Sequence, residues 1–473
     1  MTGDDGRHRA QDAGPRTIAA MIDLGLDRME AWEAGWRAFP VDASWDVDAA
    51  AMSEAIEALT ERLTDNYPFF HPDYAAQMLM PPHPVAAAAY AIAQRINPNA
   101  HANDGGPATT RLEIEVVDTH KAMFGYDPKT SLGHLTSSGT IANLEALWVS
   151  RELHPDKSIA YSRLAHYTHA RMCDVLRMEG VAIEPDALGR IDLDALERAL
   201  KSGRVGTVVA TAGSTGTGSV DQVDEIVPLA ARYGVRVHVD AAYGGYFVLL
   251  AGTDALDPAV ARAFRAIRDA DSIVVDPHKR GLQPYGCGSV FFRDATVGRF
   301  YKHDSPYTYF TSAELHLGEI SLECSRAGAA AAALWTTMRV LPLEAERGLG
   351  PVLARTRGAA VRWAELIRES EILRLAMEPA LDIVTFYPVV EGEQRVSAIS
   401  AETQRVFEAL MNDPVEPVYL ATLKVRPPLL SGDASLVWDQ DELLVFRSVL
   451  MQPEHFDAVP NLHRRVAEAV NWP

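Results

Sequence analysis

Four short apolar runs in this 473-residue chain end on side chains that carry charge or exchange protons. A lysine amine can capture an aldehyde as a Schiff base, and a carboxylate can keep a proton on a basic nitrogen. If these side chains meet in space, they could hold a small ligand both by charge and by a covalent bond. In chain order they are Ser162 and His166, then Ser214 and Thr215, then Asp240, and last Asp276, His278 and Lys279.

The apolar runs belong to a region, residues 108 to 295, in which strand patterns alternate with helix patterns. Strands are predicted at "VGTVVATAG", "VRVHVDAA", "SIVVD" and "GSVFFRD", and helices at "RIDLDALERALKSG" and "VDEIVPLAARYG". Such alternation indicates crossover connections and a mostly parallel sheet, so the fold class is α/β. Ligands of these sheets bind at the carboxyl ends of the strands, and we expect the reactive residues to meet there.

A fifth candidate site lies in "HLTSSGTIANLEALWVSREL", where Ser137, Ser138, Gly139 and Thr140 precede an amphipathic helix. Small hydroxyl residues at a helix start cap free backbone N–H groups. The same free N–H groups, together with the helix dipole, bind phosphate. Either use fits this motif when it is taken alone.

Together, the five places indicate a ligand with a phosphate, a basic nitrogen, a flat face and an aldehyde. Pyridoxal 5'-phosphate has all four features. Asp240 would raise the pKa of the pyridine nitrogen, and the protonated ring would then accept electrons. Lys279 would form the resting Schiff base, and the helix start at Ser138 would bind the phosphate. This chemistry needs no metal, and we expect none.

Charge and composition narrow the range of partners. The chain has 44 Lys and Arg against 64 Asp and Glu, and its net charge of −20 would repel nucleic acid and anionic lipid. No apolar run approaches the roughly 18 residues of a membrane helix. Three cysteines (Cys173, Cys287 and Cys324) cannot form a complete disulfide set, and the first residues lack the apolar core of a signal peptide. We therefore expect a cytoplasmic protein without nucleic-acid or membrane partners.

The pattern of elements predicts three parts. Residues 1–105 read as an N-terminal helical arm with proline-rich connectors, and residues 106–342 as the large α/β domain. Residues 343–473 begin with a long helix, "LEAERGLGPVLARTRGAAVRWAELIRES", and continue with strands such as "DIVTFYPVV" and "LLVFRSVLMQP" before a terminal helix. This last part is predicted to be a small α+β domain.

The motifs resemble those of the group II pyridoxal-phosphate-dependent amino acid decarboxylases, the aromatic-amino-acid, tyrosine and glutamate decarboxylase relatives of fold type I. The resemblance covers about residues 65 to 460. "SSGTIANLEAL" looks like their phosphate-binding helix start, and "AHYT" like the segment whose histidine, here His166, stacks on the cofactor ring. "HVDAAYGG" looks like the segment whose Asp240 pairs with the ring nitrogen, and "DPHK" like the Schiff-base tetrapeptide of Lys279.

The resemblance also implies the phosphate contacts. Ser138, Gly139 and Thr140 are expected to bind the phosphate, with His278 close to it. Asp276 stands where some relatives have Asn. Because a carboxylate cannot donate a hydrogen bond to phosphate as an amide does, this position departs from the pattern.

Further roles follow from the resemblance on the other side of the cofactor. Thr215 is implied near the lysine and the 3-oxygen of the ring, and Ala242 under the ring, where its small size lets the cofactor lie flat. "KHDSPYTYFTSAELHLGEISLECSRAG" resembles the mobile loop and the following "SR" element of the family, and either Tyr307 or Tyr309 could reach the neighbouring subunit's site. Arg280 departs from the tryptophan that commonly follows the lysine, which indicates a different outer wall of the site.

The implied reaction is decarboxylation of an L-amino acid to its amine and CO2 through a Schiff base on Lys279. A loop tyrosine, with His166 as a relay, would return a proton to Cα, and the enzyme would be a two-fold homodimer with shared active sites. Two alternatives use the same cofactor: a retro-aldol carbon–carbon lyase, and a decarboxylating oxidative deaminase that gives an aldehyde. Another alternative is a non-catalytic cofactor-binding relative. The residues do not specify which amino acid is the substrate.

Overall fold

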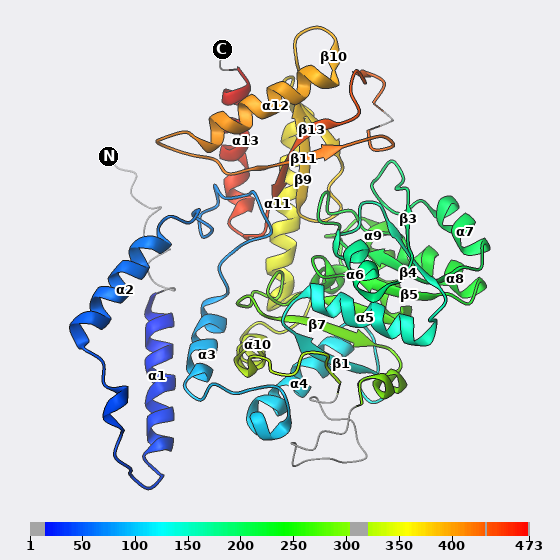
Figure 1. The fold of residues 1–473 in the computed structure, drawn as a ribbon. Helices are drawn as coiled ribbons and strands as arrows, with labels where there is room; N and C mark the ends of the chain where they lie inside the picture. Colours follow the sequence, from blue (N-terminus) through cyan, green and yellow to red (C-terminus); the bar gives the residue numbers. More distant parts are fainter. Residues whose placement is uncertain (1–14, 303–319, 431–432, 472–473) are drawn as a thin grey trace.

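The structure, a computed structural model, describes residues 15–302, 320–430 and 433–471, whose arrangement is shown in Figure 1. The larger part contains a seven-stranded sheet in the order β1-β7-β6-β5-β4-β2-β3. Strand β7 is antiparallel to both of its neighbours, and the strands from β6 to β3 are parallel to one another. The strands are β1 (Leu132–Thr136), β2 (Ser158–Ser162), β3 (Gly180–Ile183), β4 (Val205–Thr211), β5 (Arg236–Asp240), β6 (Ser272–Val275) and β7 (Gly288–Phe292). The predicted α/β class with a mostly parallel sheet is confirmed.

Helices cover both faces of this sheet because successive strand side chains point to opposite faces. Val208 and Ala210 of β4 belong to the core that includes α8 and α9, whereas Val209 packs with Leu147 of α5 and Met172 of α6. The helices of this part are α4 (Pro107–Met123), α5 (Gly139–Leu153), α6 (Thr168–Leu176), α7 (Leu193–Lys201), α8 (Val223–Arg232), α9 (Pro258–Ala266) and α10 (Gly328–Val340). Short 3-10 helices lie at Asn103–Gly105, Gly245–Leu250, Ile267–Asp269 and Ala295–Phe300.

The C-terminal part contains an antiparallel sheet in the order β11-β13-β9-β8 and three helices. Its core includes Trp363, Phe386 and Phe446, all fully buried. The predicted long helix begins later than expected: Gly348 has φ 66°, and Leu349 N donates to Pro342 O at 3.1 Å, so a turn precedes α11. The elements are α11 (Leu349–Glu369), β8 (Leu373–Met377), β9 (Ile383–Pro388), β10 (Gln394–Arg395), α12 (Val396–Met411), β11 (Ala421–Val425), β12 (Leu436–Val437), β13 (Leu443–Val449) and α13 (His455–Asn471).

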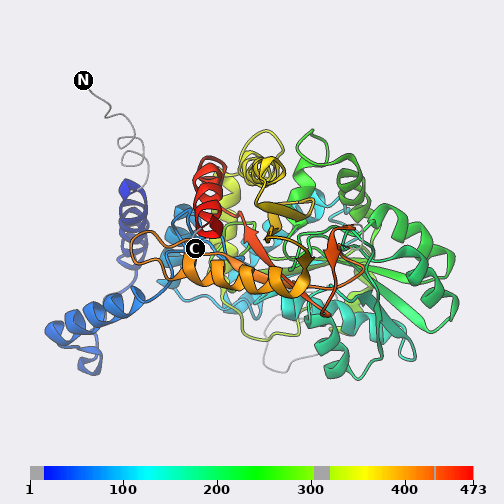
Figure 2. The ribbon, with the colours of Figure 1, turned by 90° about the horizontal axis from the view of Figure 1, so that it is seen from above.

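The N-terminal segment forms an arm that stands away from the rest of the molecule (Figures 1 and 2). It consists of α1 (Pro15–Glu33), a 3-10 turn (Ala43–Trp45) and α2 (Ala49–Leu63), and α1 packs against α3 (Pro84–Gln94). Helix α2 has no buried residue. The arm exposes large apolar side chains, including Trp36, Phe39 and Trp45, each at least 70% exposed. Among the described residues, no helix is both long and apolar enough to cross a membrane.

Candidate active site

The carboxyl ends of four neighbouring parallel strands form one edge of the large sheet. In spatial order these strands are β6, β5, β4 and β2, so the chain segments that follow them lie side by side. The reactive residues predicted from the sequence follow these strands. The topology therefore brings Asp276 and Lys279, Asp240, Thr215 and His166 to a common edge, as the alternating pattern predicts.

Lys279 lies at the centre of this edge. Its Nζ lies 3.1 Å from Oδ2 of Asp276, and its side chain keeps 22% of its surface exposed. The Asp276 carboxylate is buried, and its Oδ1 has no hydrogen-bond partner among the described residues. His278 donates from Nδ1 to the carbonyl of Cys287 at 2.6 Å and places Nε2 3.6 Å from Asp276 Oδ2. Lysine, imidazole and carboxylate thus form one compact cluster.

The start of α5 lies against this cluster. Ser138 has extended backbone angles and its Oγ accepts from Ile141 N at 3.3 Å, so it is the N-cap of the helix. The amides of Gly139 and Thr140 have no hydrogen-bond partner within the described residues. A Cβ on Gly139 would lie 2.5 Å from Oδ2 of Asp276, so a side chain at this position would displace the Asp276 carboxylate. The helix start can therefore cap itself and still offer two N–H groups to an anion.

Asp240 ends β5 as a buried carboxylate with a donor on each oxygen. His169 Nε2 donates to Oδ2 at 2.8 Å, and the backbone N of Ala242 donates to Oδ1 at 3.1 Å. Although burial alone would raise the pKa of Asp240, the hydrogen bond from His169 holds that pKa well below its ordinary value. Asp240 is therefore an anion that can hold a proton on a basic nitrogen. The His169 contact is not anticipated by the sequence analysis.

His166 lies in the loop between β2 and α6. Burial lowers the pKa of His166, while the charge of Asp240 acts in the opposite direction and that of Lys279 adds to the lowering. Its Nδ1 accepts from Thr168 N at 3.2 Å, so the proton of the neutral ring is on Nε2. The lowered pKa favours the neutral imidazole, which lies close enough to the carboxylate and the amine to sense both charges.

The loop after β4 carries Thr215 and meets an arginine that the sequence analysis also overlooks. Thr215 is exposed, and its carbonyl accepts from Nη2 of Arg447 at 2.7 Å. Arg447 is buried in β13, with Gly216 O and Ala76 O as further acceptors at 3.0 and 3.2 Å. Its partners among the described residues are neutral oxygens. A charged residue within the apolar run "LLVFRSVL" is the signal that could have identified it.

Arg280, which follows the lysine, points away from the cluster and does not form an outer wall of the site. Its guanidinium is buried, forms an ion pair with Asp382 and donates to Met451 O at 2.8 Å. Tyr243 completes the group by donating to Asp382 Oδ1 at 2.6 Å. Arg280 therefore links the large sheet to the segments that flank β9 and β13.

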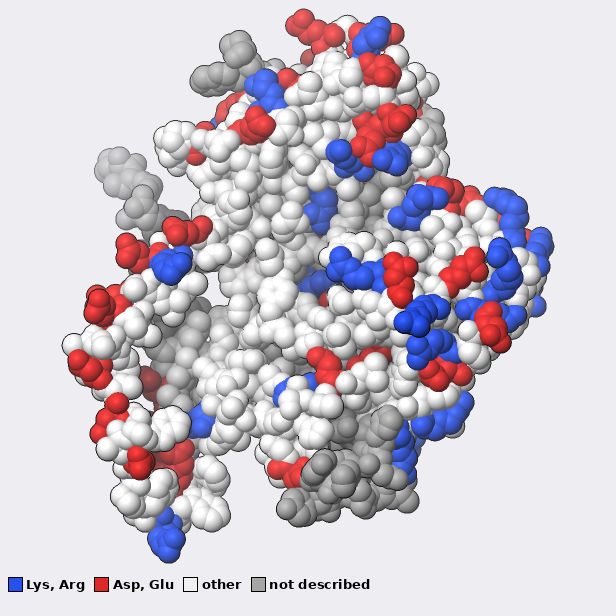
Figure 3. All heavy atoms as spheres, viewed as in Figure 1, with Lys and Arg blue, Asp and Glu red and all other residues white. Residues whose placement is uncertain are grey.

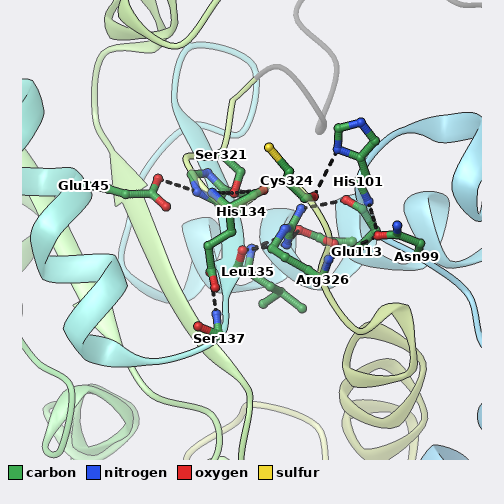
Figure 4. Close-up of polar contacts among 12 residues, drawn as sticks. Asn99, His101, Glu113, His134, Leu135, Ser137, Glu145, Ser321, Cys324 and Arg326 are labelled. Carbon is green, nitrogen blue, oxygen red and sulfur yellow. Dashed lines mark hydrogen bonds and ion pairs between the residues drawn. The ribbon is translucent and has the colours of Figure 1, made fainter. Parts of the chain in front are cut away.

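The segment from Ser321 to Arg326 lies against the end of β1 and the residues that precede α5 (Figure 4). Arg326 Nη1 donates to Glu113 Oε1 at 2.9 Å and to Leu135 O at 2.6 Å. Ser137 N, next to the cap of α5, donates to Glu323 Oε2 at 2.7 Å. Tyr307 and Tyr309, the two candidate acids on the preceding loop, lie outside the described residues.

These residues fit pyridoxal 5'-phosphate. Lys279 offers an amine, the start of α5 offers two free amides for a phosphate, and Asp240 is an anion with lone pairs still available. The glycine required at position 139 leaves backbone rather than side chain at the phosphate position. Asp276 opposes an anion there, although it is paired with Lys279, and Glu323 places a second carboxylate on the neighbouring Ser137 N.

Comparison with known proteins agrees with this arrangement. The chain matches the model of the pyridoxal-dependent decarboxylase conserved domain over residues 52–388. The L-tyrosine decarboxylase of Enterococcus faecium is 29% identical over 392 residues, which cover 62% of this chain and 63% of that enzyme. A probable L-tyrosine/L-aspartate decarboxylase of Methanothrix thermoacetophila is 31% identical over 309 residues, covering 64% and 74% of the two chains. This chain therefore spans less than two thirds of the Enterococcus enzyme.

Solved structures share the fold. The structure of mouse CSAD in apo form has a TM-score of 0.74 at 20% identity and covers 93% of this chain and 91% of its own. Catharanthus roseus tryptophan decarboxylase in complex with L-tryptophan has a TM-score of 0.73 at 16% identity and covers 95% and 98%. The fold is thus that of the fold type I decarboxylases. The chain belongs to the pyridoxal-dependent decarboxylase family, as the four motifs predict.

Proposed function

We propose that this protein removes the α-carboxyl group of an L-amino acid as CO2 and releases the amine, with pyridoxal 5'-phosphate as cofactor. The observation that carries the proposal is the convergence of Lys279, Asp240 and the start of α5 at one sheet edge, in a chain of this family. The curated relatives described above are named as decarboxylases, which favours this reaction over the lyase and deaminase alternatives.

When bound, the cofactor supplies an aldehyde that captures an amine and a protonated ring that accepts the electron pair of the breaking Cα–carboxylate bond. Lys279 would hold the aldehyde carbon of the cofactor through Nζ. Asp240 would keep a proton on the ring nitrogen because its own pKa is low. The amides of Gly139 and Thr140 would bind the phosphate, and His166 would face the ring.

The test is a screen of the purified protein with pyridoxal 5'-phosphate and each proteinogenic amino acid, with CO2 and amine measured together. We expect equimolar CO2 and amine from at least one substrate, and neither product from Lys279→Ala. Aldehyde with ammonia in place of amine would contradict the proposed reaction. A protein that binds the cofactor but turns over no amino acid would instead favour a binding role.

We also propose that Tyr307 or Tyr309 returns the proton to Cα after CO2 has left, as the resemblance of their loop implies. A phenol on a segment that closes over the site would deliver the proton away from water. The single variants Tyr307→Phe and Tyr309→Phe should both bind the cofactor. One of them should release CO2 with a reduced amine yield. Wild-type amine yields and rates from both variants would exclude the two phenols and favour His166.

The arm supports a further proposal, that the protein is a two-fold homodimer. Helix α2 has 15 residues and buries none of them, and an isolated helix of that length is marginal in water. Trp36, Phe39 and Trp45 lie exposed near it. Much of the arm's visible surface is uncharged, with carboxylates scattered along it (Figure 3). A second copy of this chain would cover this apolar surface.

Light scattering should give the mass of a dimer, and Trp36→Glu with Trp45→Glu should shift the protein towards monomer. Mixed dimers test whether the sites are shared. A dimer of one Lys279→Ala subunit and one Tyr307→Phe/Tyr309→Phe subunit contains one intact site only if lysine and tyrosine come from different subunits. Activity in the mixture above that of either parent supports shared sites, and no gain contradicts them.

Two further proposals concern the domain bounds and the cellular location of the protein. We propose that residues 1–105, 106–342 and 343–473 act as arm, cofactor-binding domain and small domain, since the seven-stranded sheet falls in the second range and the four-stranded and two-stranded sheets fall in the third. We also propose that the protein works in the cytoplasm, which cell fractionation would test.

A further inference from the structure

A fully buried histidine, His169, contacts the carboxylate that would meet the cofactor's ring nitrogen. Its side chain is 0% exposed, and Nε2 lies 2.8 Å from Oδ2 of Asp240, whose side chain is 7% exposed. His169 lies in α6, three residues after His166, and its backbone N donates to His166 O at 3.1 Å. This hydrogen bond closes one turn of the chain at the start of α6, and both imidazoles lie near Asp240.

The remaining hydrogen-bonding atoms of His169 and Asp240 indicate which ring nitrogen of His169 carries the proton. Nδ1 of His169 is buried and has no partner among the described residues, so a proton there would be an unpaired buried charge. The neutral ring with its proton on Nε2 is the form that fits. Asp240 accepts one hydrogen bond on each oxygen, from His169 and from Ala242 N. Each oxygen keeps a lone pair, and the two donors on opposite oxygens prevent the carboxylate from rotating.

We propose that His169 is a positioning residue that holds the Asp240 carboxylate, through Nε2–H, in the orientation that meets the cofactor's ring nitrogen. The inference rests on the proposed function and assigns a new role within it. An outer partner that orients a ligating group typically changes affinity or activity by about 10- to 100-fold when removed, as at metal sites. His169 would act on the cofactor in the same way, through Asp240 and without touching it.

The charged and titratable neighbours of the pair do not provide a substitute for His169. His238, also in β5, has its pKa lowered to about 3 by burial, and it is already paired with Ser272 Oγ and Asn143 Oδ1, both at 2.9 Å. The ring of Tyr161 packs 6.1 Å from the ring of His169. The other charged or titratable side chains near these histidines and Asp240 are His166, Lys279, Asp276 and Arg236. None of them donates a hydrogen bond to Asp240 in the described structure.

A purely space-filling role would be served better by an apolar side chain. Position 169 is buried in α6 beside Met172 and Cys173, which are apolar and buried. An imidazole with an unpartnered Nδ1 costs free energy at such a position. The hydrogen bond to Asp240 is the interaction that compensates for it.

The test compares His169→Phe, which removes the donor, with His169→Gln, which keeps an N–H donor. His120→Phe is the matched control: His120 is also fully buried, bonded to Val116 O and Tyr246 Oη, and has no contact with Asp240. Two readouts are independent of turnover. One is the dissociation constant of pyridoxal 5'-phosphate, titrated into apoprotein by its visible absorbance, and the other is the 15N NMR shift of cofactor labelled at the ring nitrogen.

We expect the Phe variant to bind the cofactor about 10-fold more weakly, with the 15N signal shifted towards that of an unprotonated ring. The Gln variant should recover at least part of both effects, and the control should match the wild type. Affinity within about twofold of wild type and an unchanged 15N signal in the Phe variant would overturn the inference. If that variant does not fold, His169→Met replaces it, and equal affinities for Met and Gln overturn the inference. A wild-type protein that binds no cofactor would overturn the proposed function as well.

Discussion

Lys279 Nζ and Asp276 Oδ2 lie 3.1 Å apart, and the same carboxylate lies against the backbone of Gly139 at the start of α5. One anion therefore contacts both the amine that would hold the cofactor and the helix start that would hold its phosphate. Asp276 must compete with that phosphate for the positive end of the helix.

The variant Asp276→Asn should consequently bind pyridoxal 5'-phosphate more tightly, by about 3- to 10-fold, because an amide donates to phosphate where a carboxylate repels it. Titration of the apoprotein measures this. Asp254→Asn, at an exposed carboxylate elsewhere in the large domain, is the control. Weaker binding by the Asn variant would show that Asp276 supports the site, through Lys279, more than it opposes the phosphate.

Arg280 and Asp382 form a buried ion pair between the large sheet and the small domain. Arg280→Met would leave Asp382 buried without its cation, which should lower the free energy of unfolding by about 3 to 5 kcal/mol. Adding Asp382→Leu removes the orphaned charge and should recover most of that loss. Urea unfolding of the wild type, Arg280→Met, Asp382→Leu and the double variant gives the coupling energy. Additive effects of the two changes would mean that the pair does not stabilise the domain contact.

Buried histidines make the fold sensitive to acid. Burial lowers the pKa of His120 to about 4, below its ordinary value of 6.5. Because the folded pKa is the lower one, the unfolded chain takes up the proton first. His120 therefore costs no stability above about pH 6.5 and costs progressively more as the pH falls towards 4, about 2 kcal/mol at pH 5.

The free energy of unfolding of His120→Phe should accordingly fall less between pH 7 and pH 5 than that of the wild type. His71→Gln, a change at a half-exposed histidine, should keep the wild-type dependence. Chemical denaturation at several pH values measures both. Equal slopes for wild type and His120→Phe would mean that His120 is not protonated on unfolding in this range.

The large sheet could be predicted because its strands are short apolar runs that end on polar residues, and parallel strands place those ends together. Asp240 and Lys279 stand at such ends, so their position follows from the pattern. The contact between His169 and Asp240 could not be predicted in this way, because it depends on how α6 is oriented relative to β5. The contacts of Arg280 depend on the rotamer of its side chain, and the sequence shows only that the residue is an arginine.

The small domain and the arm were predictable to different degrees. The strands around Phe386 and Phe446 are apolar and were expected, whereas the start of α11 was predicted six residues early because the turn at Gly348 interrupts an otherwise helical pattern. In the arm, helical periodicity predicts α2 but cannot show that none of the described parts of the chain covers it. The sequence shows Arg447 as a charged residue within an apolar strand. Its partners could not be predicted, because they lie in the loop after β4, which meets β13 only in the folded chain.

The most direct test of the central claim is to reduce the cofactor-loaded protein with borohydride and locate the modified residue by peptide mass spectrometry. The account predicts one cofactor per chain, attached to Lys279, and no attachment or visible absorbance in Lys279→Ala. Attachment to another lysine, or an unchanged yield of modified protein in the Lys279→Ala variant, would contradict the assignment of the site.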